Sequence, residues 1–75
     1  MTRNAFLTPD NWMLDIFSSK AAREGSVIRR KSRDIERYVG RDRFLQEVER
    51  RGFRAVENAG QVVVFCNREP LRRIV

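Results

Sequence analysis

The chain contains no histidine and a single cysteine, Cys66, among its 75 residues. Histidine is the side chain that most often performs acid–base chemistry near neutral pH, and its absence excludes Ser-His and Cys-His nucleophile systems. The usual tetrahedral zinc sites need several Cys or His ligands, so they are excluded too. Because one cysteine cannot form an internal disulfide, we expect a reducing, cytoplasmic location.

Long apolar runs and glycine-rich loops are also missing. The longest uninterrupted apolar run is Val62–Cys66, far below the about 20 residues that a membrane-spanning helix needs. The apolar pair Phe6–Leu7 is followed at once by Thr8–Asp10, which does not match a signal peptide. The four glycines stand singly, where capping and turns explain them, so no phosphate-binding loop is expected. The sequence therefore predicts no membrane partner, no cofactor, no metal and no catalytic residue.

Arginine is what the chain has in abundance. Lysine and arginine number 16 against 10 acidic residues, and ten of the basic residues lie between positions 29 and 54 with five acidic ones. A local field of one sign attracts anionic partners, of which nucleic acid is the first to consider. Six basic residues have few acids in register and form the predicted phosphate-binding patch: Arg29, Arg30, Lys31, Arg33, Arg37 and Arg41.

Internal pairing is the alternative interpretation of these arginines. Arg43 and Arg51 each lie four residues from Glu47, the spacing at which charges pair along a helix. By contrast, Arg33, Arg37 and Arg41 would align along one helix face if a helix continued through Gly40. We expect pairing for the first group and an exposed patch for the second.

The first predicted helix runs from Pro9 to about Arg23. Thr8 is a hydroxyl N-cap, Pro9 fits the first helical position, and Gly25 offers a left-handed C-cap. Leu7 should pack on Trp12 as a hydrophobic staple. The apolar residues follow the spacing of a one-sided stripe: Trp12, Met13, Ile16, Phe17 and Ala21. An alternative function uses this stripe, with Trp12, Ile16 and Phe17 as anchors of a protein-binding adaptor.

The middle segment is predicted to be helical from Ser32 or Asp34 onward. Gly40 interrupts the apolar periodicity, and a glycine inside a helix costs about 1 kcal/mol against alanine. We therefore expect two pieces, the second spanning Arg41–Arg51 and ending at Gly52.

After Gly52, the period of the apolar pattern changes to two residues. Phe53–Glu57 and Gln61–Cys66 predict two strands of a hairpin with Gly60 at a positive φ, while Ser26–Lys31 is a weaker strand candidate. The second hairpin strand is apolar on both faces, so it should lie inside a sheet or under a helix. Leu71–Val75 is expected to be a loose tail or an added edge strand.

These elements predict one small α+β domain over residues 1–75, with an amphipathic N-terminal helix, a basic helical middle and a C-terminal β-hairpin packed on the helices. Cys66 and Trp12 are expected to be packed rather than reactive or exposed. Tyr38 and Phe53 should serve the core, and Phe44 should be partly exposed. Interleaved with arginines, these aromatics could alternatively stack on bases.

The segment Arg43–Val56, followed by Gly60–Val64, resembles the helix, Gly-aromatic and strand-turn-strand core of HicA-type mRNA interferases. The resemblance implies a double-stranded-RNA-binding-like fold with a hairpin against a helix. Those enzymes carry a catalytic histidine just after the glycine of the turn, where this chain has Gln61 and Val62. Nuclease activity is therefore not expected from this resemblance.

The chain as a whole, notably Asn4–Trp12 and the stretch through Cys66–Asn67, is similar to small uncharacterised alphaproteobacterial proteins that often carry the label phosphoribosylanthranilate isomerase. That isomerase is a TIM barrel, which needs about 200 or more residues. The 75 residues cannot close such a barrel and hold no matching catalytic motif, so an isomerase in name only is expected. The sequence thus favours non-catalytic binding of RNA or DNA, with a protein partner or a homodimer as further possibilities.

Overall fold

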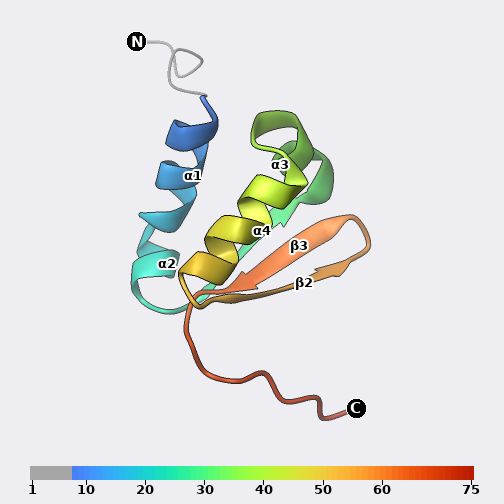
Figure 1. The fold of residues 1–75 in the computed structure, drawn as a ribbon. Helices are drawn as coiled ribbons and strands as arrows, with labels where there is room; N and C mark the ends of the chain where they lie inside the picture. Colours follow the sequence, from blue (N-terminus) through green and yellow to red (C-terminus); the bar gives the residue numbers. More distant parts are fainter. Residues whose placement is uncertain (1–7) are drawn as a thin grey trace.

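The computed structural model describes residues 8–75 and confirms the α+β class, with helices packed against a three-stranded sheet (Figure 1). Helix α4 crosses in front of the sheet in Figure 1, and the C-terminal segment leaves the fold at the opposite end from α3. The elements are α1 (Pro9–Phe17), α2 (Lys20–Arg23), β1 (Val27–Lys31), α3 (Ser32–Tyr38), α4 (Arg41–Arg50), β2 (Arg54–Asn58) and β3 (Gln61–Phe65).

Helix α1 begins as predicted but ends early. The Asn11 amide donates to the Thr8 hydroxyl at 3.2 Å, which confirms the N-cap. The prediction of one helix to about Arg23 is wrong, because Ser19 has extended backbone and caps α2 by accepting from the Ala22 amide at 3.3 Å. Serine hydroxyls compete for backbone groups in this way and interrupt helices. The expected packing of Leu7 on Trp12 lies outside the described residues.

The two-piece prediction for the middle segment is confirmed. Gly40 has a φ of +96°, outside the helical region, and separates α3 from α4. Since Gly40 has no side chain to cap α4, the Glu36 carboxylate accepts from the Arg41 amide at 3.3 Å instead. At the other end, Gly52 has a φ of +77° and lets the Phe53 amide donate to the Val48 carbonyl at 3.0 Å. The chain thereby turns from α4 into β2.

The sheet is antiparallel with strand order β1-β3-β2. The weak strand candidate forms edge strand β1, and the apolar strand β3 lies in the centre, as predicted. The hairpin turn consists of Ala59 and Gly60, with φ values of +52° and +76°. Two positive φ values are typical of a type I′ turn, whose twist matches that of the strands. Residues 71–75 add no strand.

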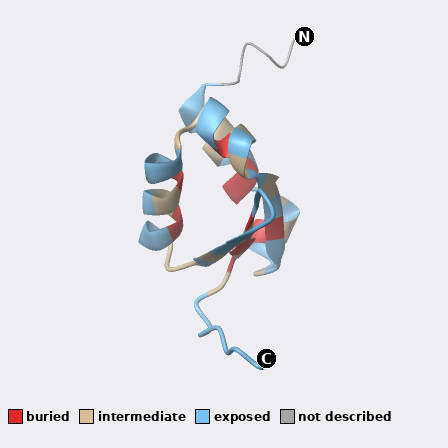
Figure 2. Ribbon diagram, turned by 90° about the vertical axis from the view of Figure 1, so that its right-hand side faces the viewer, coloured by how far each residue is buried: buried red, intermediate tan, exposed pale blue. Residues whose placement is uncertain are grey.

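The core lies between the helices and one face of the sheet, where buried residues gather in Figure 2. Phe44 is fully buried, so the prediction of partial exposure is wrong. Its ring stacks on Phe17 with centroids 5.8 Å apart and meets the edge of Trp12 at 6.3 Å. The buried residues are Ile16, Phe17, Ala22, Ile28, Ile35, Phe44, Val48, Val62, Val64 and Cys66.

Candidate nucleic-acid interface

Strand register divides the side chains of the sheet between two faces. Partners across neighbouring strands point to the same face, and successive residues along a strand point to opposite faces. Val64 pairs with Ile28 on one side and Ala55 on the other, and all three contribute to the core. We call this the helix face. It consists of Ile28, Arg30, Ala55, Glu57, Val62 and Val64.

The opposite side of the sheet, here called the open face, has no helix of residues 8–75 packed on it. Val27 and Val56 are 41% and 45% exposed, whereas Val62 and Val64 on the helix face are 4% and 1% exposed. Among the described residues, neither Val63 nor Phe65 belongs to the core or packs against it. The open face consists of Val27, Arg29, Lys31, Arg54, Val56, Asn58, Gln61, Val63 and Phe65.

The open face combines apolar and basic side chains. Arg29 and Lys31 come from β1 and Arg54 comes from β2, and all three are exposed. Glu57 is the one acidic residue of the described strands, and it belongs to the helix face. The open face is therefore uniformly positive where it is charged.

Glu57, on the helix face, already accepts hydrogen bonds from two side chains. Its carboxylate accepts from both terminal nitrogens of Arg41, at 2.9 and 3.0 Å, and from the Ser32 hydroxyl at 2.6 Å. The hydrogen bonds from Arg41 and then Ser32 hold the pKa of Glu57 below its ordinary value. Arg41, a member of the predicted patch, is thus neutralised in place by a bidentate contact.

The structure does not bring the whole predicted patch onto one side. Arg29 and Lys31 lie on the open face, whereas Arg30 lies on the helix face and donates to the Arg29 carbonyl at 2.6 Å. Arg33 and Arg37 follow on α3, where the Arg37 guanidinium lies 5.5 Å from the centre of the Tyr38 ring. The break at Gly40 removes Arg41 from the line that a continuous helix would have formed.

Ionic pairing separates two groups of basic residues. Within residues 8–75, no ion pair involves the basic residues of β1 and α3. In contrast, four arginines at and after the start of α4 are paired: Arg41 with Glu57, Arg43 with Asp10, and Arg50 and Arg51 with Glu47. The predicted pairing of Arg51 with Glu47 is confirmed, whereas Arg43 pairs with Asp10 of α1 rather than with Glu47.

Glu47 neutralises two arginines at once. Its Oε2 atom lies 2.7 Å from a terminal nitrogen of Arg50 and 2.6 Å from Nε of Arg51, and its Oε1 atom accepts from Nε of Arg50 at 3.0 Å. The hydrogen bond from Arg50, followed by that from Arg51, lowers the pKa of Glu47 to about 2 against the opposing effect of burial. The Arg51 guanidinium also lies 4.6 Å from the centre of the Phe17 ring, so this network closes over the core.

The alternative anchors of the first helix are not a free surface. Ile16 and Phe17 are buried, and Trp12 is half-buried with its ring stacked on Tyr38 at 5.6 Å. The predicted adaptor surface is therefore part of the core in this structure. Cys66 is buried as well, and burial raises the pKa of its thiol, so the nucleophilic thiolate is disfavoured.

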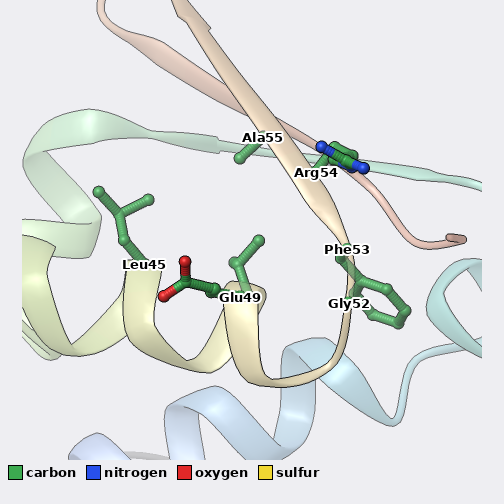
Figure 3. Close-up of a pocket in the computed structure, with 7 residues that line it drawn as sticks. Leu45, Glu49, Gly52, Phe53, Arg54 and Ala55 are labelled. Atoms are coloured by element: carbon green, nitrogen blue, oxygen red, sulfur yellow. The ribbon is translucent and has the colours of Figure 1, made fainter. Parts of the chain in front are cut away.

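Arg54 is one of the residues that line a shallow groove between α4 and β2 (Figure 3). Figure 3 shows Ala55 on the side of β2 that faces Leu45, and Arg54 on the other side of the strand. The patch predicted from sequence omitted Arg54. The alternation of the predicted hairpin could have identified it, because Arg54, Val56 and Asn58 share a strand face.

No helix within residues 8–75 is long and apolar enough to cross a membrane. The chain matches no protein-family model, no curated protein and no solved structure in the three comparisons made.

Proposed function

We propose that this protein binds nucleic acid without catalysing a reaction on it. The contacts are made to phosphates by basic residues of β1 and α3: Arg29, Arg30, Lys31, Arg33 and Arg37. The observation that carries the proposal is the uneven pairing of charge. These five cations have no carboxylate partner within residues 8–75, whereas the arginines of α4 do.

Unpaired guanidinium groups are suited to phosphate for two reasons. Arginine presents a planar fork of donors that matches phosphate oxygens. In addition, each phosphate that a protein cation neutralises releases condensed counterions, which gives a favourable free energy at low salt. An arginine that is already held by a carboxylate must first lose that partner, so the α4 arginines contribute less. For this reason Arg41 is removed from the predicted set.

The first test is a fluorescence polarisation titration of the full chain with a labelled oligonucleotide at several salt concentrations. Five phosphate contacts predict that log K falls with log[salt] with a slope between about −3 and −5. A slope near zero, or no affinity at about 50 mM salt, would remove the proposal.

A pair of double variants distinguishes binding by the local patch from binding by net charge alone. Arg33→Gln with Arg37→Gln removes two unpaired cations of α3, and Arg43→Gln with Arg50→Gln removes two paired ones. Both variants lower the net charge equally. The first should weaken binding about 10-fold or more and reduce the salt slope by about 1 to 2, because two phosphate contacts are lost, and the second should change affinity much less. Equal losses in both variants would show that net charge alone attracts nucleic acid.

A further inference from the structure

We infer that the open face of the sheet is a platform for single-stranded nucleic acid, with a base stacked on Phe65 and phosphates held by Arg29, Lys31 and Arg54. The inference rests on the proposed function and deepens it by naming the substrate class. It also adds Arg54 and Phe65 to the residues expected to make contact.

Phe65 occupies a suitable position for stacking. It belongs to the central strand, its direct neighbours across the sheet are Val27 and Arg54, and it is not part of the core. Direct cross-strand neighbours have Cβ atoms about 5 Å apart, and diagonal neighbours such as Arg29 lie about 7–8 Å away. A base stacked on the Phe65 ring would therefore have a guanidinium within reach of the phosphate on either side.

The basic residues of the open face indicate which kind of ligand binds there. The exposed valines alone would suit a protein partner or a second copy of this chain. However, Arg29, Lys31 and Arg54 are not accompanied by any acid on this face, so two copies packed face to face would place like charges together. Such juxtaposition of like charges is electrostatically unfavourable. The occupant is therefore polyanionic and also offers flat apolar surface, which describes a nucleic-acid strand.

Base stacking distinguishes a single strand from a duplex. In a duplex the base faces are already stacked on one another and only their edges are accessible, whereas unpaired bases can stack on aromatic side chains. Phe65 therefore adds affinity for a single strand only. The cations add affinity for both forms, because phosphates are present in each.

The test compares a single-stranded oligonucleotide with a duplex of the same sequence in polarisation titrations of the full chain. Phe65→Leu keeps an apolar side chain in the central strand but removes the aromatic ring. We expect it to weaken single-strand binding about 5- to 100-fold and duplex binding by less than about twofold. Phe65→Tyr retains the ring and should keep single-strand affinity. Arg54→Gln should weaken binding of both forms.

The outcomes distinguish a failure of this inference from a failure of the proposed function. If Phe65→Leu leaves the preference for single strands unchanged while the variants of α3 still weaken binding, phosphate contact stands and the platform is wrong. If the wild-type protein binds neither form, both ideas fail. If polyglutamate displaces the oligonucleotide at equal charge concentration, the face fits an acidic protein instead and the platform is again overturned.

A measurement on the unmodified protein covers the case in which Phe65→Leu does not fold. Photo-crosslinking to a bromouracil-substituted single strand, followed by tryptic digestion, should give an adduct on the peptide Ala55–Arg68. Phe65 is the one aromatic residue of that peptide. Adducts confined to other peptides would overturn the platform.

Discussion

The two faces of the sheet differ in burial, although the central strand β3 carries apolar side chains on both faces. Val62 and Val64 of β3 face the helices and are buried, while Val63 and Phe65 of the same strand face away from them and are partly exposed. An apolar strand is often covered on both sides. In the described part of this chain, residues 8–75, the helices pack on one side only, so apolar side chains of the central strand remain partly exposed.

The two sides of the sheet also differ in whether their basic residues have carboxylate partners. Behind the helix face, four arginines are held by Asp10, Glu47 and Glu57: Arg41, Arg43, Arg50 and Arg51. The open face carries basic residues and no acid. A count of arginines in the sequence does not separate these groups, because only the folded chain determines which carboxylate lies within reach of which guanidinium.

The largest expected effect comes from matched aromatic substitutions on the two sides. Phe44→Ala removes a fully buried ring and should destabilise the protein by about 3–5 kcal/mol. Phe65→Ala on the open face should cost about 1 kcal/mol, because a partly exposed side chain loses less contact. Urea unfolding measures both free energies. Similar costs for the two variants would mean that the open face is covered in solution.

A pair of neighbouring valines tests the same comparison with identical chemistry. Val64→Ala leaves a cavity in the core and should cost about 2 kcal/mol, whereas Val63→Ala should cost about 0.5–1 kcal/mol. Because the residues are adjacent in β3 and lose the same two methyl groups, differences in strand propensity largely cancel. Thermal or urea unfolding that ranks Val63→Ala as the costlier change would contradict the assignment of the faces.

Features governed by a few neighbouring residues were predictable from the sequence. The Thr8 cap, the interruption at Gly40 and the turn at Gly60 each depend on local backbone geometry, and all three predictions are confirmed. The α+β class followed from these local features and from the change of apolar period after Gly52.

Features that depend on distant parts of the chain were not predictable in the same way. Phe44 and Leu45 are adjacent and both apolar, and the packing of α1 decides that Phe44 is the buried one. Arg43 pairs with Asp10 from another helix, which spacing along α4 does not indicate. For the candidate site, the excess of basic residues in β1 and α3 was apparent from sequence, but the division into an open and a helix face required the sheet register.

The last comparison concerns the effect of acid on the ion pairs of the helix side. Glu47 has a pKa lowered to about 2 by Arg50 and Arg51, so its ionised form is stabilised by folding. This contribution is complete above the ordinary glutamate pKa of about 4.3 and is lost as the pH falls toward 2. Glu47→Gln should therefore cost about 1–2 kcal/mol at pH 7 and little at pH 2.

Urea unfolding of both proteins at the two pH values measures this difference, and Arg29→Gln on the open face serves as its control. Arg29 has no ion-pair partner within residues 8–75, so its substitution should leave the dependence of stability on pH as it is in the wild-type protein. Equal acid sensitivity in Glu47→Gln and wild type would show that the Glu47 network contributes nothing to folding. The contrast between paired and unpaired arginines would then lose its energetic basis.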